Sequence, residues 1–243
     1  HGTLRDDFSS LRICRSGADK VPAELEREFN ELTGLVIDEG YGMTEAGLIT
    51  LNPPSGTIKT GSVGCAVPSV SLSIRDDNQK QLGADKAGRL WIRSDSLTTG
   101  YWDNQAATDE LFVDGWMDTG DLMKADADGY LRFCGRKKQI IVHDGSNISP
   151  QEVEEVLLEH AAVDNAAVIG VHDLMHGENV RAYVTLKEDI SRPTPTELIR
   201  FARQRIGYKA PDEIDYLDEM PLNATGKVDR LSLKRLAEAR HGV

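Results

Sequence analysis

One stretch, residues 120–146, constrains the fold more than any other, because it places three consecutive cations between strand-like apolar runs. Asp128-Gly129 is a turn dipeptide, and residues 130–133 after it alternate apolar and polar, as a half-buried strand does. Arg136-Lys137-Lys138 then precede a second apolar run at residues 140–142. Because an unpaired buried charge is costly, these cations must face solvent, a partner surface or an anionic ligand. The stretch predicts a β-hairpin that ends at a charged joint.

The residues before this hairpin predict a parallel strand–helix–strand unit. Residues 11–14 alternate as a short strand does, and Pro22 stands where a helix would begin, with apolar residues following at helical spacing. Gly34 is a suitable C-terminal cap, and we expect residues 35–37 to form a short buried strand. In such a unit, ligands bind at the carboxyl ends of the strands.

Residues 59–137 predict a small antiparallel sheet or barrel. Short alternating runs, such as residues 70–74 and 90–93, are separated by clusters of turn residues. Three aromatic residues follow these runs, and their simplest interpretation is core packing: Tyr101, Trp102 and Trp116.

Beyond the charged joint, the chain predicts a compact α+β domain. Ser149 and Thr194 are each followed three positions later by Glu, so each is expected to begin a helix with a capping box. Apolar or alternating runs predict strands at residues 166–171, 180–187 and 214–217, and a last helix at residues 231–239. The order helix, strand, strand, helix, strand, helix suits a domain of about a hundred residues.

Composition excludes several classes of partner. The net charge of -12 over 243 residues argues against nucleic acid or an anionic membrane surface as the main partner. No apolar run approaches the ~20 residues of a transmembrane helix. The three cysteines are widely spaced without a CxxC pair, which favours a reducing, cytoplasmic compartment. Four histidines lack metal-ligand spacing, so we expect no metal site among them: His143, His160, His172 and His176.

A set of motifs carries a resemblance to a known family. They are Tyr41-Gly42-Met43-Thr44-Glu45, Thr119-Gly120-Asp121, Gly135-Arg136-Lys137-Lys138, residues 145–154 and Gly226-Lys227. Their order and spacing resemble the adenylate-forming (AMP-binding) enzyme superfamily, and most closely its acyl-CoA synthetases. The family also contains peptide-synthetase adenylation domains and luciferases.

The resemblance implies an α/β plus α+β architecture. Residues 1–137 would be the end of the large domain, with a strand–helix–strand unit at about 8–58 and a β-rich subdomain at about 59–137. Residues 138–243 would be the small, mobile C-terminal α+β domain, with Lys138 as its hinge. The family's phosphate loop and most of its acyl pocket would precede His1, so we expect the C-terminal portion of a longer enzyme that is inactive alone.

The resemblance also implies a nucleotide site. Its residues would be Ser16, Gly17, Ala18, Tyr41, Gly42, Thr44, Asp121 and Arg136. Tyr41 would stack on the adenine, against which residues 16–18 would lie. Asp121 would accept hydrogen bonds from both ribose hydroxyls, which suits the several lone pairs of a carboxylate. Arg136 would reach the ribose or a phosphate.

Catalytic roles are implied for three residues. Thr44 would bond a phosphate oxygen, and Glu45 would hold Mg²⁺ as a hard oxygen ligand. Lys227 would enter the site to contact the substrate carboxylate and the α-phosphate, where charge develops in the transition state. In the second step of the reaction, transfer of the acyl group to CoA, the side of the small domain that carries Gly145 would face the site.

The function implied is that of an ATP-dependent acid–thiol ligase. It would convert a carboxylic acid, with fatty acids the first candidates, into acyl-AMP with Mg-ATP, and then transfer the acyl group to CoA. One alternative is an adenylation module or acyl-AMP ligase that loads a carrier protein. Another is a non-catalytic nucleotide-binding module, and a luciferase-like oxidase is the least favoured.

Overall fold

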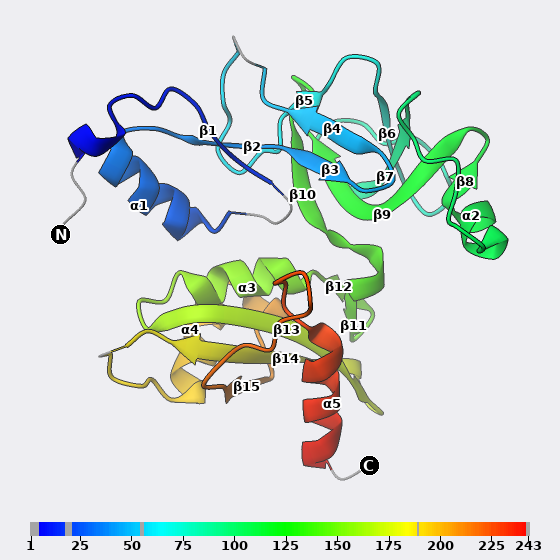
Figure 1. Cartoon of the computed structure of the whole chain (residues 1–243). Helices are drawn as coiled ribbons and strands as arrows, with labels where there is room; N and C mark the ends of the chain where they lie inside the picture. The colour runs from blue at the N-terminus through cyan, green and yellow to red at the C-terminus, as the bar shows by residue number, and fades with distance from the viewer. Residues whose placement is uncertain (1–4, 18–20, 54–55, 189, 242–243) are drawn as a thin grey trace. The chain divides into compact units, whose positions relative to one another are not determined.

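The computed structural model describes residues 5–17, 21–53, 56–188 and 190–241, and the chain divides into two compact units. The first is His1–Lys137 and the second Lys138–Val243 (Figure 1). Within the described residues, no helix is long and apolar enough to cross a membrane.

The first unit begins with the parallel strand–helix–strand arrangement that the sequence predicts, although the first strand is Cys14–Ser16 rather than residues 11–14. Its elements are η1 (Arg5–Phe8), β1 (Cys14–Ser16), α1 (Ala23–Thr33) and β2 (Ile37–Glu39). Strands β1 and β2 pair in parallel, in the register Cys14 to Ile37 (Figure 1). Gly34 ends α1 with a left-handed φ of 75°, and its N–H donates to the carbonyl of Asn30 at 2.7 Å.

The position and burial of β2 correct one prediction. The strand lies two residues later than expected, and its buried side chains are acidic: Asp38 is 3 % exposed, whereas Val36 is 38 % exposed. Arg15 Nε and Asn52 Nδ2 each donate to the Asp38 carboxylate, at 2.9 Å. Glu39 accepts from the backbone N–H of Val21 at 3.0 Å. These partners make the burial of two carboxylates tolerable.

Two antiparallel sheets complete the first unit. One contains β3 (Tyr41–Met43), β4 (Gly47–Leu51) and β5 (Cys65–Ala66). The other has the order β10-β9-β7-β6, with β8 on β9; its strands are β6 (Ser71–Arg75), β7 (Gly88–Arg93), β8 (Phe112–Val113), β9 (Trp116–Ala125) and β10 (Leu131–Arg136). Helix α2 (Gln105–Leu111) precedes β8, and Asn104 caps it by accepting from the N–H of Ala107 at 3.1 Å. The predicted antiparallel β-rich region is therefore confirmed.

The core of this region is mostly aliphatic and methionine side chains, and the prediction that Tyr101, Trp102 and Trp116 pack in a core is wrong in part. Leu90, Ile92, Met117 and Met123 are fully buried, but Trp102 is 96 % exposed and Tyr101 is also exposed. Trp116 is half-buried beneath the guanidinium groups of Arg75 and Arg93. Trp102 and Tyr101 therefore lie outside the core, whereas Trp91 of β7 is buried.

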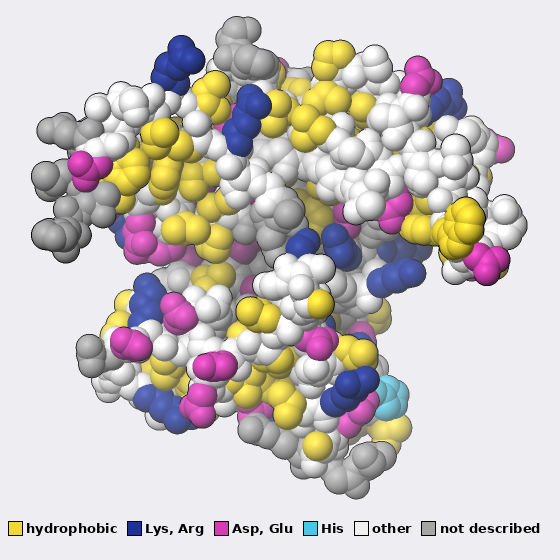
Figure 2. Space-filling view, viewed as in Figure 1, with side chains coloured by type: hydrophobic (Ala, Val, Ile, Leu, Met, Phe, Trp, Pro, Cys, Tyr) yellow, Lys and Arg dark blue, Asp and Glu magenta, His cyan; other side chains and the backbone are white. Residues whose placement is uncertain are grey.

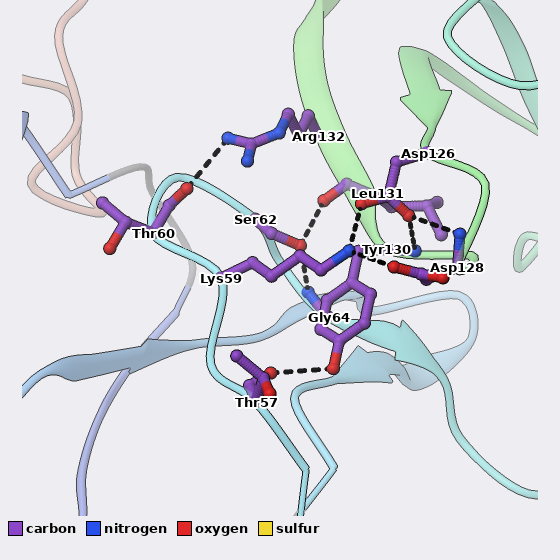
Figure 3. Close-up of polar contacts among 10 residues, drawn as sticks. All are labelled: Thr57, Lys59, Thr60, Ser62, Gly64, Asp126, Asp128, Tyr130, Leu131 and Arg132. Atoms are coloured by element: carbon purple, nitrogen blue, oxygen red, sulfur yellow. Dashed lines mark hydrogen bonds and ion pairs between the residues drawn. The ribbon is translucent and has the colours of Figure 1, made fainter.

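The turn between β9 and β10 is tied to the loop at residues 57–64 (Figure 3). Lys59 Nζ contacts Asp126 Oδ2 at 2.6 Å and Asp128 Oδ2 at 2.8 Å. The Tyr130 hydroxyl donates to the carbonyl of Thr57 at 2.7 Å, and the Ser62 hydroxyl donates to that of Leu131 at 2.9 Å. These contacts fix the start of β10, the strand that carries Arg136.

The second unit is a sheet covered by helices on both faces (Figure 1). Its strands are β11 (Ile141–His143), β12 (Ser146–Ile148), β13 (Val163–Asp173), β14 (Gly177–Leu186) and β15 (Glu213–Tyr216). The order is β12-β11-β14-β13, and β15 pairs with β14 in parallel. Its helices are η2 (Lys137–Gln139), which begins at the boundary, α3 (Pro150–Leu158), α4 (Pro195–Ile206), η3 (Gly207–Lys209) and α5 (Arg230–His241).

Strand alternation decides which helix covers which face. Val168 and Ala182 pack with α3 and α4, whereas Ala167, Ile169 and Tyr183 pack with α5. Because successive side chains of a strand point to opposite faces, β13 and β14 supply both cores at once. The predicted α+β class is thus confirmed.

The two predicted capping boxes have different outcomes. Thr194 forms the full box, accepting from the N–H of Glu197 at 3.3 Å while Glu197 accepts from the N–H of Thr194 at 2.7 Å. Ser149 begins α3, but its side chain makes no capping bond and donates to Gln151 at 3.1 Å. Glu152, its expected partner, binds Lys209 Nζ at 2.7 Å. A tertiary ion pair has replaced the local box.

Candidate functional site

A buried carboxylate is the centre of the candidate site in the first unit. Asp121 is 4 % exposed, and both of its oxygens are engaged. The Tyr41 hydroxyl donates to Oδ2 at 2.6 Å, and Arg136 Nε donates to Oδ1 at 3.1 Å. Burial and then the charge of Asp121 raise the pKa of Tyr41, which therefore stays a protonated donor. Three predicted site residues from β3, β9 and β10 are brought together here.

Local backbone geometry explains the position of Asp121. It lies opposite Arg136 in the β9–β10 ladder, where the register shifts between Phe133 and Gly135. The Thr119 hydroxyl accepts from the N–H of Asp121 at 3.1 Å and donates to the carbonyl of Leu90 at 2.8 Å. Gly120 has a φ of 71°, a left-handed value that a residue with a Cβ rarely adopts. The Thr-Gly-Asp order thus lets β9 turn the carboxylate toward Tyr41.

Thr44 and Glu45 lie in the tight turn between β3 and β4. Gly42 is required beside it, because a Cβ at residue 42 would lie 2.5 Å from the carbonyl oxygen of Gly47. The Glu45 carboxylate accepts from the Tyr101 hydroxyl at 2.8 Å, which raises the pKa of Tyr101. Thr44 is exposed and Glu45 half-buried, so both oxygens can be approached from solvent. The Glu45 carboxylate is a hard oxygen ligand of the kind that Mg²⁺ prefers, and the Thr44 hydroxyl is a hydrogen-bond donor suited to a phosphate oxygen.

Ser16 ends β1 and Gly17 follows it, and β1 pairs with β2, the strand that ends shortly before Tyr41. The N–H of Gly40 donates to the carbonyl of Ser16 at 3.2 Å, so the end of β1 is joined to the residue before Tyr41. Ala18, the third residue of this predicted segment, lies outside the described residues.

The remaining predicted residues belong to three separate segments of the second unit. Lys138 lies in η2, and Gly145 forms the β11–β12 turn with a φ of 74°. Lys227 is half-buried in the loop before α5. Its N–H donates to Asn223 Oδ1 at 3.1 Å, and its carbonyl accepts from the N–H of Asn223 at 2.7 Å. This closed turn gives the lysine a defined backbone.

Tyr101 contacts the predicted site residue Glu45, a contact that the sequence interpretation missed. It orients Glu45 from a position 56 residues away. The sequence carries no signal for this contact, because an aromatic residue after a glycine is equally typical of packing.

Two family models match the chain. The AMP-binding enzyme model matches residues 1–102, and the AMP-binding enzyme C-terminal domain model matches residues 152–227. The chain belongs to the AMP-binding enzyme family.

Members of the AMP-binding family with curated names cover nearly all of the chain. A long-chain-fatty-acid–CoA ligase of Yersinia pestis is 40 % identical over 230 residues, which are 94 % of this chain and 41 % of that protein. The ligase of the same name from Bacillus subtilis is 37 % identical, covering 98 % of this chain and 43 % of its own length. The chain therefore spans about two fifths of the length of these relatives.

Solved structures of the AMP-binding family have the same fold. ATP-bound MatB from Rhodopseudomonas palustris has a TM-score of 0.91 at 30 % identity, covering 97 % of this chain and 47 % of that one. The anthranilate CoA ligase AuaEII in complex with anthranoyl-AMP has a TM-score of 0.86 at 34 % identity, covering 98 % and 46 %.

Proposed function

We propose that the chain supplies the ribose- and adenine-binding part of an ATP-dependent acid–thiol ligase, together with its mobile C-terminal domain. The reaction joins a carboxylic acid to AMP with release of pyrophosphate, and then passes the acyl group to the thiol of CoA with release of AMP. The observation that carries this proposal is the buried Asp121 carboxylate between Tyr41 and Arg136, in a chain matched by both AMP-binding family models. The names of the relatives support a long-chain fatty acid as the substrate.

Asp121 is the residue that we assign to the ribose. A carboxylate offers about four lone-pair directions, and two donors from the protein leave acceptor capacity for a vicinal diol. The hydrogen bond to Asp121 fixes the Tyr41 ring, which we assign to the adenine face. Arg136 is half-exposed and brings a permanent positive charge next to the ribose and phosphates.

Thr44 and Glu45 are assigned to the phosphate end of the nucleotide. The Thr44 hydroxyl donates to a phosphate oxygen, and Glu45, oriented by Tyr101, is the ligand for Mg²⁺. When bound, Mg²⁺ neutralises phosphate charge and makes pyrophosphate a better leaving group.

Lys227 and Lys138 provide the step that depends on the second unit. Lys227 stabilises the charge that develops as the substrate carboxylate attacks the α-phosphorus. Rotation about Lys138 then withdraws Lys227 and presents the Gly145 side to CoA. Forming acyl-AMP first divides one difficult substitution into two easier ones. We also propose a reducing, cytoplasmic location, because the three cysteines are widely spaced in the sequence without a CxxC pair.

Binding of a fluorescent AMP analogue tests the nucleotide site in this chain. Asp121→Asn replaces acceptor lone pairs by an amide donor, so we expect roughly 10- to 100-fold weaker binding. The control is Asp95→Asn, an exposed aspartate just after β7, which should bind as the parent does. Equal affinity in both variants would refute the ribose role.

The two half-reactions test the ligase assignment in the protein at its full natural length. Lys227→Ala should abolish acid-dependent pyrophosphate release yet largely spare thioester formation from supplied acyl-AMP, whereas Lys234→Ala, exposed on α5, should change neither. Equal loss in both half-reactions would refute the role of Lys227. Acyl transfer to a carrier protein but not to CoA would assign the alternative acceptor.

A further inference from the structure

Three potential metal ligands meet at one end of the sheet of the second unit. They are His143 at the end of β11, Asp144 in the following turn, and His176 in the turn between β13 and β14. One ligand atom from each lies within 4.8 Å of the other two. The two imidazole rings stack, with their centroids 5.2 Å apart and an interplanar angle of 20°. The sequence interpretation expected no metal site among the histidines, because their spacing shows no ligand pattern and 32 residues separate Asp144 from His176.

The hydrogen bond of His143 selects the nitrogen that can bind a metal. Its Nδ1 lies 2.7 Å from the backbone carbonyl of Glu178, which only accepts, so Nδ1 carries the proton in this contact. In the neutral ring Nε2 then holds a lone pair, and it faces Asp144 Oδ2 at 3.7 Å. Histidine ligands commonly donate their other N–H to a backbone carbonyl in this way.

The Nε2–Oδ2 distance is suited to a bridging cation. Two acceptors at 3.7 Å form no hydrogen bond and repel each other unless a positive charge lies between them. Zn²⁺ binds imidazole nitrogen and carboxylate oxygen at about 2.0–2.1 Å, so neighbouring ligand atoms of a tetrahedral site are roughly 3.3–3.5 Å apart. Small rotations of the His143 and Asp144 side chains bring the observed 3.7 Å to this ligand–ligand distance.

The backbone holds the three side chains in place without a metal. The N–H of Asp144 donates to the carbonyl of His176 at 3.0 Å, joining the two turns directly. His143 is paired with Gly177 across β11 and β14. Asp173 accepts from the N–H of His176 at 2.8 Å and so shapes the second turn. The ligands are therefore presented by paired strands and a closed turn.

We propose that His143 Nε2, the Asp144 carboxylate and the His176 imidazole form a binding site for one divalent transition-metal ion, with Zn²⁺ as the preferred ion. Two imidazoles and one carboxylate favour Zn²⁺ over Mg²⁺ or Ca²⁺, which take oxygen ligands. Water completes the coordination, because Asp144 and His176 are open to solvent. This site is separate from Glu45 and does not depend on the ligase assignment. Bound metal would clamp the β11 hairpin to the β13–β14 turn and stabilise the second unit.

Calorimetric titration with Zn²⁺ tests the site in the complete, tag-free chain, stripped with chelator and kept at about pH 8, where imidazoles are mostly neutral. We expect one equivalent of Zn²⁺ to bind, and His143→Gln and His176→Gln each to weaken binding at least about tenfold. Asp144→Asn should weaken it similarly, and it preserves the turn because Asn tolerates the φ of 48° at this position. The matched control is His172→Gln, an exposed histidine on β13, which should bind as the parent does.

Three results would overturn the proposal. The first is absence of saturable binding of Zn²⁺, which would leave Asp144 and His176 as a simple ion pair. The second is parent-like affinity of Asp144→Asn for Zn²⁺. If either histidine variant fails to fold, as judged by its circular dichroism signal, Asp144→Asn alone decides the test. The third is a thiolate-to-metal charge-transfer band on Co²⁺ substitution, which would place the metal on cysteine.

Discussion

The N-terminal segment of the first unit buries carboxylates, whereas the second unit is built on a large apolar core. In residues 5–53 several apolar side chains are exposed while carboxylates are buried: Leu11, Ile13, Leu25, Leu32 and Val36 are exposed, and Asp38 and Glu39 are buried. Hydrophobic side chains gather over α1 and β1 in Figure 2. In the second unit the apolar residues of α3, α4 and α5 close on both faces of one sheet.

The two regions therefore have different roles: the second unit is stabilised by its own core, whereas the N-terminal segment contributes a residue to the candidate site. The second unit has a complete core of its own, so its fold depends on packing within residues 138–243. The N-terminal segment contributes Tyr41 to the Asp121 site but keeps an apolar face open to solvent. Exposed apolar patches of this kind mark interaction surfaces, which fits a chain that spans about two fifths of the length of its relatives.

Matched leucine truncations should give the largest difference in stability between the two regions. Leu198→Ala in α4 empties a site that is 0 % exposed, and we expect a loss of about 2–5 kcal/mol in the free energy of unfolding. Leu25→Ala in α1 truncates a side chain that is 52 % exposed, and we expect a change within about 0.5 kcal/mol. Urea denaturation measures both. Equal costs would show that α1 is covered in solution.

Matched arginine truncations should sharpen the contrast within the second unit. Arg230 donates to both oxygens of Glu154, at 2.7 and 3.1 Å, and to the carbonyl of Val168 at 2.6 Å, largely shielded from solvent. Arg230→Ala leaves Glu154 without this cation, so we expect a loss of about 1.5–3 kcal/mol. The control, Arg205→Ala, removes an exposed pair with Glu159 and should cost at most about 1 kcal/mol. Comparable losses in the two variants would contradict a larger stabilising contribution from the shielded Arg230–Glu154 pair.

The two capping motifs give a smaller test of the same unit. Thr194→Ala removes an observed cap and should cost about 0.5–2 kcal/mol, whereas Ser149→Ala should cost almost nothing. Denaturation midpoints with unchanged slopes would measure the difference. A larger effect at Ser149 would mean that its hydroxyl caps α3 in solution.

The pH dependence of the first unit should show the smallest effect. The hydrogen bond from Lys59 lowers the pKa of Asp126, so this contact stabilises the fold above the unfolded value of about 3.9. The contribution is lost as the pH falls through the lower, folded pKa. Asp126→Asn should therefore reduce stability at neutral pH and flatten the acid-side loss. If the units unfold in separate transitions, the one moved by Asp126→Asn should differ from the one moved by Leu198→Ala.

Local features were predictable from sequence because their causes lie within a few residues. The Asp128-Gly129 turn, the Gly34 cap and the Thr194 box each depend on near neighbours in the chain. Strand alternation likewise predicted β6, β7 and β14. The same local logic failed at Ser149, where Lys209 draws its partner Glu152 away.

The sequence by itself determined the order of the elements, the charged joint and the motifs that identify the family. Only the tertiary structure decided that Tyr41 meets Asp121, that Asp38 is buried, and that His143, Asp144 and His176 converge. Periodicity and turn chemistry act over one or two turns of chain, so they are legible in a single sequence. Contacts between distant residues depend on sheet register and on which charges find partners, and these emerge only when the whole core is packed.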